Sequence, residues 1–185
     1  MDLKKKLFEL LYERSFLYRE EGFKLASGKV SPYYLDCKKT TLSSKALPLI
    51  GKLLWEEAQR FMPQAVGGLT LGADPLVAAL CFEAGLRGLP LEGFIVRKEA
   101  KGHGTGRYLE GNISPGMRAV ILEDVITTGG SSLKAVRHAR DAGLEVKAVL
   151  ALVDRDEGGR EAIEAEGLEL VSLFHIKEFL ARLKG

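Results

Sequence analysis

The sequence predicts an α/β fold with a mostly parallel central sheet and helices on both of its faces. From residue 65 onward, short apolar runs alternate with segments of helical periodicity. The runs AVGGL (65–69), AVILE (119–123) and VKAVLALVD (146–154) are continuously apolar, which is typical of parallel strands buried on both faces. The chain has 185 residues, 46% of them hydrophobic, and shows no linker or repeat. We therefore expect a single domain with its own core over residues 1–185.

The N-terminal part combines a helical stripe with an alternating segment. Residues 2–20 predict an amphipathic helix that ends at Gly22. The stripe consists of Leu3, Leu7, Leu10, Leu11, Leu17 and Tyr18. Residues 23–36 alternate between apolar and polar around Ser27 and Gly28, so we expect two short strands joined by a turn.

A second helix is predicted over 43–61, with Ser43 as its N-cap. Pro48 argues against this start, because proline is poorly tolerated beyond the first helical turn. Five strands and two helices account for most of the remaining chain. The strands are expected at 65–69, 93–97, 119–123, 146–154 and 168–174, and the helices at 75–85 and 131–143.

Composition excludes several classes of protein. The formal net charge of +2 is too small for a typical nucleic-acid-binding domain. The short lysine runs at 4–6 and 38–39 are expected to lie on a solvated face of the protein. Cys37 and Cys81 form neither a CxxC motif nor a disulfide framework, which favours a reducing compartment. The N-terminus lacks a signal-peptide pattern, and no apolar segment is long enough to span a bilayer. We expect a cytoplasmic protein that binds neither nucleic acid nor membrane.

The stretch VILEDVITTGG (120–130) predicts a binding site for a phosphorylated sugar. Ligands of parallel sheets bind beyond the carboxyl ends of the strands, where Glu123 and Asp124 are expected. Residues 127–131 (TTGGS) then lead into a helix, whose N-terminal N–H groups and partial positive charge suit a phosphate monoester. The paired carboxylates suit neighbouring hydroxyls. Together they describe a ribose 5-phosphate.

Other phosphate and metal motifs are absent. There is no GxxxxGK[ST] motif, and no GxGxxG follows the first strand of the sheet. The histidines at 103, 138 and 175 are scattered without ligand spacing, which argues against a protein-built zinc site.

A second cluster, VRKEAKGHGTG (96–106), gathers cations in a glycine-rich segment. Arg97, Lys98, Lys101 and His103 lie within seven positions, between and beside glycines that would let the loop move. Composition alone favours a solvated loop. A departing pyrophosphate, however, needs such charge as its bond breaks.

The motifs resemble those of a known family. LEDVITTGGS (122–131) resembles the phosphoribosyl-diphosphate (PRPP) binding motif of type I phosphoribosyltransferases, and RKEAKGHG (97–104) resembles the catalytic loop of orotate phosphoribosyltransferases. Three further stretches agree in family order: SGKVSPYYLD (27–36) with the substrate hood, GGLTLGADPLVAAL (67–80) with the pyrophosphate loop, and ALVDRDEGG (151–159) with a strand end that carries an orotate-contacting arginine.

The resemblance implies a fold and a reaction. The fold is that of the type I phosphoribosyltransferases, with residues of about 1–40 forming a small N-terminal hood. The reaction is Mg²⁺-dependent transfer of ribose 5-phosphate from PRPP to orotate, giving orotidine 5-phosphate and pyrophosphate in pyrimidine (UMP) biosynthesis. It proceeds with inversion at the anomeric carbon, through a transition state of oxocarbenium character. Mg²⁺ is held through PRPP rather than by direct protein ligands.

The resemblance also assigns roles to residues. Lys101, His103 and Asp124 would be catalytic, and Thr127 and Arg155 would contact orotate. Tyr33 and Tyr34 alternate across a strand, and we assign Tyr34 to the orotate pocket. The loop 97–106 would act in the neighbouring active site of a homodimer. The expected PRPP-binding residues are Arg97, Lys98, Lys101, His103, Glu123, Asp124, Val125, Ile126, Thr127, Thr128, Gly129, Gly130 and Ser131.

One position departs from the family pattern, and three other functions are weighed. Many family members carry a lysine where Ala26 precedes Ser27, and Lys24 or Lys29 could supply the missing charge. A phosphoribosyltransferase for another base is disfavoured by the loop cations and Arg155. A PRPP-responsive regulator would need a nucleic-acid-binding module or basic face, and a purely structural domain leaves the paired carboxylates unexplained.

Overall fold

The computed structural model describes residues 2–24, 30–99 and 108–184. It begins with a helix, a two-stranded hairpin and two further helices: α1 (Leu3–Ser15), β1 (Phe16–Lys24), β2 (Val30–Leu35), α2 (Lys38–Thr41) and α3 (Leu47–Ala58), the last extended by a 3₁₀ turn η1 (Gln59–Phe61). Strands and helices then alternate: β3 (Ala65–Leu69), α4 (Asp74–Leu86), β4 (Glu92–Val96), β5 (Leu109–Gly111), β6 (Arg118–Ile126), α5 (Gly130–Asp141), β7 (Glu145–Asp154), α6 (Gly159–Glu164), β8 (Glu169–His175) and α7 (Ile176–Lys184).

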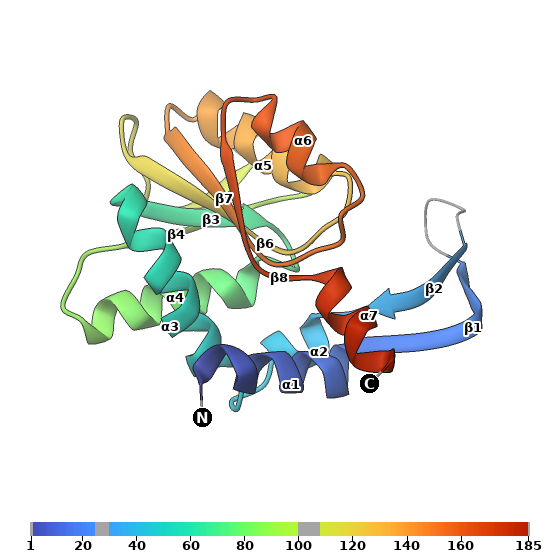
Figure 1. Ribbon diagram of the computed structural model, residues 1–185. Coiled ribbons are helices and arrows are strands. Elements are labelled where there is room, and N and C mark those ends of the chain that lie inside the picture. Colours follow the sequence, from blue (N-terminus) through green and yellow to red (C-terminus); the bar gives the residue numbers. More distant parts are fainter. Residues whose placement is uncertain (1, 25–29, 100–107, 185) are drawn as a thin grey trace.

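The central sheet has six strands in the order β5-β4-β3-β6-β7-β8. All of its neighbouring strands are parallel except the short edge strand β5, which pairs antiparallel with β4. Helices lie on both sides of this sheet, with α5 and α6 on one side and α1, α3 and α4 on the other (Figure 1). The predicted α/β architecture with a mostly parallel sheet is confirmed.

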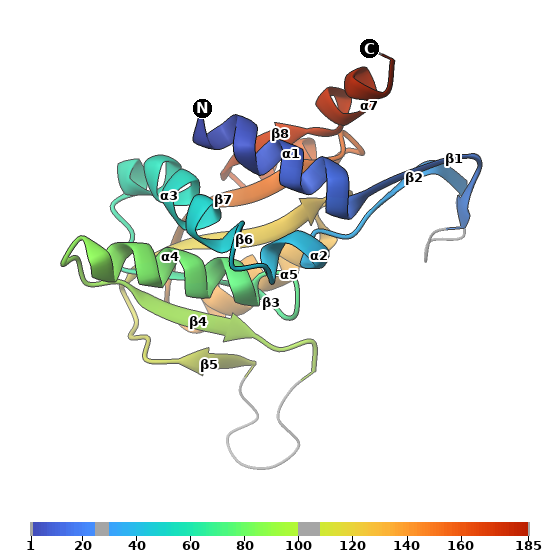
Figure 2. The ribbon, with the colours of Figure 1, turned by 90° about the horizontal axis from the view of Figure 1, so that it is seen from below.

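Alternate residues of the central strands contribute to two separate hydrophobic cores, one on each face of the sheet. Val120 and Leu122 of β6 point into the cluster formed with α1, α3 and α4, the helices that lie in front of the sheet in Figure 2. Ala119 and Ile121 point into the opposite cluster, against α5 and α6. Strands that are buried on both faces need apolar residues at every position, which explains why these runs were continuous in the sequence.

The first predicted helix is too long. The chain leaves the helical conformation at Phe16 and continues as β1, which pairs antiparallel with β2, with Phe16 opposite Leu35 and Tyr18 opposite Tyr33. Gly22 does not end a helix, because it lies inside β1 with a φ of 81° where the pairing register shifts. The expected two-stranded unit is therefore confirmed, but its first strand begins inside the predicted helix. Ser27 and Gly28 lie outside the described residues.

The predicted start of the second helix is also wrong. Helix α3 begins at Leu47 with Ala46 as its N-cap, so Ser43 caps nothing and Pro48 falls in the first turn, where its missing N–H costs little. Ser43 instead accepts a hydrogen bond from the Arg14 guanidinium over 2.9 Å. The sequence patterns did not predict α2, β5, α6 or α7, most of which are shorter than a clear period needs.

A group of aromatic rings joins the N-terminal hairpin to the C-terminal helix. Phe179 of α7 lies 4.8 Å from Phe8 of α1 and 5.5 Å from Phe16 at the start of β1, measured between ring centroids. Phe16 in turn stacks on Tyr33 of β2 at 6.1 Å. The hairpin, which projects beyond the sheet in Figure 1, is therefore attached to the body through its base.

Close backbone packing at β3 yields a stability prediction. A Cβ atom at Gly68 would overlap the Leu122 carbonyl of β6 and lie 2.6 Å from Cβ of Ala73. We expect Gly68→Ala to lower the free energy of unfolding by about 1–3 kcal/mol, because neither neighbour is a flexible side chain. Gly85→Ala is the control, since a Cβ there meets nothing within 4 Å and alanine favours the helix. Urea denaturation of both variants measures the difference, and equal stabilities would contradict the packing argument.

Candidate active site

The candidate site residues lie at one edge of the sheet, where three parallel strands end. The carboxyl ends of β3, β6 and β7 point the same way, and β6 lies between the other two (Figure 2). Ile126, the last residue of β6, pairs with Asp154, the last residue of β7. The N–H of Arg155 then donates to the Ile126 carbonyl over 2.9 Å. Arg155 and Thr127 therefore start from adjacent points of the sheet.

Residues 127–131, the glycine turn, connect β6 to α5. Gly129 is the N-cap of α5 and has a φ of 79°, a left-handed conformation that favours glycine. The turn is braced from behind by α6, because a Cβ at Gly159 would overlap Ile126 and lie 2.5 Å from the Thr127 carbonyl. Thr128, Gly130 and Ser131 remain exposed. The first N–H groups of α5 have no helical acceptor, so this turn can bind an anion.

Glu123 and Asp124 lie within β6, which runs three residues beyond the predicted strand end. Glu123 is buried and accepts a hydrogen bond of 3.2 Å from the hydroxyl of Ser132 in the first turn of α5. Burial and the neighbouring Asp124 carboxylate raise the pKa of Glu123 to about 8. Asp124 is half-buried, and its Oδ1 accepts the Val125 N–H over 3.0 Å. Glu123 is therefore held toward its neutral form at neutral pH.

The loop after β3 packs closely against Asp124. A Cβ at Gly72 would overlap the Asp124 carboxylate, so only glycine allows this approach. The Thr70 hydroxyl donates a hydrogen bond to Asp74 over 2.7 Å, and the Thr70 N–H donates one to the Val96 carbonyl. The sequence stretch 67–80 thus contacts Asp124, and its role as a pyrophosphate loop stays a prediction.

Arg155 is the most deeply buried cation of the site. It is 7% exposed and pairs with Glu157 over 2.7 Å, while its Nε has no hydrogen-bond partner among the described residues. Its guanidinium lies 4.8 Å from the ring centroid of Tyr33. Tyr34 points elsewhere: it is 41% exposed and contacts Phe23 within the hairpin. The role of Tyr34 in binding orotate stays a prediction, but Tyr33 is the tyrosine that meets Arg155.

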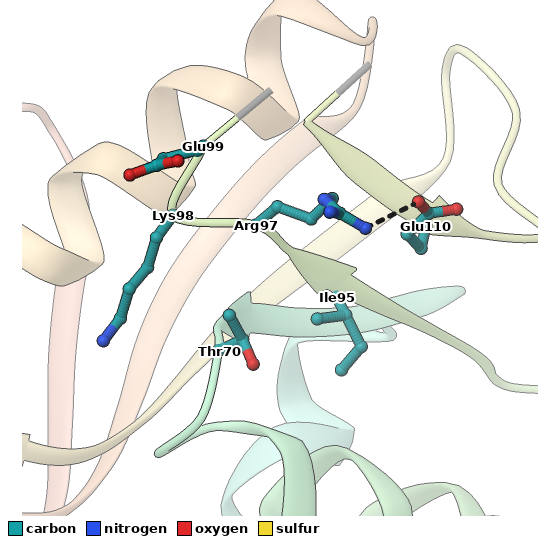
Figure 3. A pocket seen from close by; sticks show the side chains of 6 residues that line it. All are labelled: Thr70, Ile95, Arg97, Lys98, Glu99 and Glu110. Atoms are coloured by element: carbon teal, nitrogen blue, oxygen red, sulfur yellow. Dashed lines mark hydrogen bonds and ion pairs between the residues drawn. The ribbon is translucent and has the colours of Figure 1, made fainter. Parts of the chain in front are cut away.

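Arg97 and Lys98 follow β4 and line a pocket of about 440 Å³ together with Thr70, Ile95, Glu99 and Glu110 (Figure 3). The Arg97 side chain points to Glu110, with 3.4 Å between Nη1 and Oε1, whereas Lys98 extends away from it. The Nε of Arg97 is buried and lacks a hydrogen-bond partner among the described residues. Lys101 and His103, like Ala26 and Lys29, lie outside the described residues.

Sequence reasoning missed two polar groups next to the site. Ser132 follows the motif and bonds Glu123, a contact that no periodicity could reveal. Lys38 is exposed, as predicted for a solvated face, and its Nζ pairs with Asp36 over 2.7 Å. This bond raises the pKa of Lys38, with further contributions from Asp124 and Tyr34. Lys38 therefore lies within the field of the site carboxylates.

One group of potential metal ligands occurs among the described residues. Ligand atoms of Asp154, Asp156 and His175 lie within 4.8 Å of one another. Arg160 already pairs with Asp154 over 3.2 Å, and Lys177 pairs with Asp156 over 2.9 Å. Because cations already neutralise both carboxylates, the cluster is explained as an ion-pair network. In the described ranges, no helix combines the length and the apolarity that crossing a membrane requires.

Known proteins resemble this chain over nearly its whole length. The orotate phosphoribosyltransferase of Aquifex aeolicus is 51% identical over 178 residues, which cover 96% of this chain and 97% of that protein. The orotate phosphoribosyltransferase of Rhodopirellula baltica is 49% identical over 175 residues, covering 91% and 90% of the two chains. No family model matches the chain.

Solved structures agree with the sequence relatives. The orotate phosphoribosyltransferase of Mycobacterium tuberculosis H37Rv, in complex with Fe(III) dicitrate, aligns with a TM-score of 0.85 at 40% identity, covering 96% of this chain and 99% of that one. Its complex with PRPP aligns with a TM-score of 0.82 at 37% identity, covering 96% and 99%. The fold described above is therefore shared with solved members of one enzyme family.

The raised pKa of Glu123 predicts a pH-dependent stability. A carboxyl group whose pKa is higher in the folded than in the unfolded state stabilises the fold fully below its unfolded pKa, and this contribution is lost as the pH rises toward 8. We expect the stability of the wild type relative to Glu123→Gln to fall by roughly 2–4 kcal/mol between about pH 5 and pH 8.5. Denaturant unfolding of both ligand-free proteins measures it. A difference that does not change with pH would contradict the buried, neutral carboxyl group.

Proposed function

Because the chain belongs to the orotate phosphoribosyltransferase family, we propose that it transfers ribose 5-phosphate from PRPP to orotate. The products are orotidine 5-phosphate and pyrophosphate, and the pathway is the synthesis of UMP. The observation that carries this proposal is the adjacency of Arg155 to the glycine turn. A buried guanidinium with an unpartnered N–H suits a carboxylate, and a helix N-terminus suits a phosphate.

The proposed binding mode follows the order of groups along the sheet edge. The 5-phosphate binds the N–H groups and hydroxyls of residues 127–131, and the ribose hydroxyls bind Glu123 and Asp124. Orotate binds between Arg155 and the hood (about 1–40), where Tyr33 covers the guanidinium. The diphosphate binds Arg97 and Lys98, which the homodimer proposed below supplies from the neighbouring subunit. Lys101 and His103 join it in this proposal by family resemblance alone.

Catalysis in this arrangement depends on position and charge. Orotate is already an anionic nucleophile, so the site needs no strong base to activate it. The protein holds both reactants in line and places cations at the departing diphosphate, where negative charge develops. Arg155 holds the orotate carboxylate on the β7 side of the glycine turn.

Mg²⁺ is proposed to enter with PRPP and to neutralise its diphosphate charge. The residues present fit this mode. Glu123 is bonded to Ser132 and is neutral near pH 7, and Asp124 is the accessible carboxylate, which the ribose hydroxyls occupy. Mg²⁺ usually keeps several waters and binds substrate phosphates, so PRPP itself can carry the ion without a direct protein ligand.

A homodimer is proposed in which residues 97–106 act in the neighbouring active site. The exposed apolar residues Phe82, Leu86 and Leu89 support association, since they lie one helical turn apart on α4 and in the turn that follows it.

A cytoplasmic location is proposed as well. Cys37 and Cys81 are free, and burial raises the pKa of the Cys37 thiol, so both fit a reducing compartment.

The first test is an orotate absorbance assay with PRPP and Mg²⁺, with uracil and hypoxanthine as parallel bases. We expect orotate to be consumed and the other bases to react little.

Arg155→Met should lower kcat/KM for orotate by about 10²-fold or more, since it removes a buried carboxylate partner. Arg140→Met is the matched control, because Arg140 pairs with Glu166 on the surface. Reaction of hypoxanthine instead would refute the role of Arg155, and binding of PRPP without any turnover would indicate a regulator.

The proposed dimer has its own test, in which two inactive variants are mixed. Lys101→Ala removes a cation from the loop, and Asp124→Asn alters the carboxylate of β6; each should lower turnover by about 10²-fold or more. If the loop serves the neighbouring subunit, mixed dimers contain one site with both groups intact, and activity recovers to about a quarter of the wild-type value at equal mixing. Subunit exchange confirmed by native mass spectrometry, without recovery, would show that each loop serves its own subunit.

A further inference from the structure

One edge of the Arg155 guanidinium makes no hydrogen bond. Its Nε and Nη2 atoms are both buried, and neither has a hydrogen-bond partner in the part of the chain that the structure describes. The N–H groups of these two atoms point the same way, which is the geometry that binds both oxygens of a carboxylate. Buried donors without acceptors destabilise a fold, so we expect this edge to gain a partner when a ligand binds.

The Glu157 carboxylate lies at one end of this edge. Its Oε1 is 2.7 Å from Nη2 of Arg155, which is an ion-pair distance, but the contact lacks the alignment of a hydrogen bond. Tyr33 covers the face of the same guanidinium, with 4.8 Å between its ring centroid and Cζ of Arg155. A carboxylate that approaches the Nε–Nη2 edge therefore meets Glu157 there.

Of the two paired side chains, Glu157 is the one that can move away. The Arg155 side chain is 7% exposed, whereas that of Glu157 is 36% exposed and can turn directly into water. The turn that carries both is held in place, because the Asp156 N–H donates to Asp154 over 2.9 Å and the Asp156 carboxylate pairs with Lys177 over 2.9 Å. Opening of the pair thus needs only a rotation of the Glu157 side chain.

We propose that Glu157 is a specificity-determining residue, which occupies the carboxylate position at Arg155 until orotate replaces it. The inference rests on the proposed function, in which Arg155 binds the orotate carboxylate. In the empty site, Glu157 neutralises a buried cation that would otherwise be unpaired. When orotate binds, its carboxylate bonds both Nε and Nη2, and the Glu157 side chain turns into water. A base without a carboxylate has no group that displaces Glu157.

The affinity for orotate is then a difference between two carboxylates. Orotate gains two aligned, charge-assisted hydrogen bonds to Arg155, and the single misaligned contact of Glu157 is lost. Removing the charge of Glu157 strengthens the binding of orotate and of its nucleotide, because no ion pair is broken and no second carboxylate stays nearby. If Glu157 only positioned Arg155, the same change would weaken binding. The sign of the effect separates the two roles.

Two nucleotides that differ only in the carboxylate test the proposal. Orotidine 5-phosphate carries this group, and UMP is the same nucleotide without it. In calorimetric titrations, we expect Glu157→Gln to bind orotidine 5-phosphate about 5- to 10-fold more tightly than the wild type does, while the Kd for UMP changes less than about twofold. Glu161→Gln is the matched control, because it removes the same charge from an exposed position in the first turn of α6.

The outcomes distinguish this inference from the proposed function. If the wild type binds orotidine 5-phosphate and Glu157→Gln leaves that Kd unchanged or raises it, the inference is overturned while the proposed function stands. Tightening that extends equally to UMP, or that Glu161→Gln reproduces, would also overturn the inference, since it would be a general effect of charge. A wild type that neither binds orotidine 5-phosphate nor consumes orotate would refute the proposed function, and the inference with it.

Kinetics and thermal unfolding supply two further readouts. In Glu157→Gln, the KM for orotate should fall by about 5-fold, while the KM for PRPP changes less than about twofold. The ligand-free variant should melt about 2–4 °C below the wild type, because Arg155 loses its counter-charge, and saturating orotidine 5-phosphate should reduce that difference. An unchanged melting temperature of the ligand-free variant would contradict the role of Glu157 in the empty site.

Discussion

The parallel pairing of β6 with β7 is the constraint on which the rest of the site depends. This pairing continues to Ile126 and Asp154, so both strands end at the same level. The glycine turn and Arg155 therefore leave the sheet side by side, and the Arg155 N–H extends the ladder by one more bond to the Ile126 carbonyl. A shift of one strand by a single residue would reverse the facing of its side chains and separate the two groups. The register is secured by apolar residues that fill both cores.

Close backbone contacts complete this edge. Gly72 lets the loop after β3 approach Asp124, and Gly159 lets α6 support the glycine turn from behind. Gly72 meets the Asp124 carboxylate and Gly159 meets the Thr127 carbonyl, and a Cβ at either glycine would hold these groups apart. At the same edge, burial keeps Glu123 neutral, while Asp124 remains the accessible carboxylate.

Helix α5 connects the glycine turn to the end of β4. It begins at the anion-binding turn and packs its apolar face on the sheet, and it contacts the end of β4 through Lys134 and His138. Strand pairing joins these regions only through β3, which lies between β6 and β4. The aromatic contacts of Phe16, Tyr33 and Phe179 do the same for the hairpin, which would otherwise be linked to the sheet only through the chain.

The sequence by itself determined the α/β architecture and the family, along with the residues of the glycine turn and the paired carboxylates. It could do so because buried parallel strands impose continuous apolar runs, and because a phosphate-binding turn requires glycines and hydroxyls next to one another in the chain. Only the tertiary structure decided what depends on distant partners. Strand pairing with β2 ended the first helix at Ser15, and the hairpin geometry brought Tyr33 rather than Tyr34 to Arg155. Packing gave Ser132, Lys134 and His138 their contacts with the site and its neighbouring segment. None of these contacts leaves a local pattern, because each joins residues whose closeness is created by the fold.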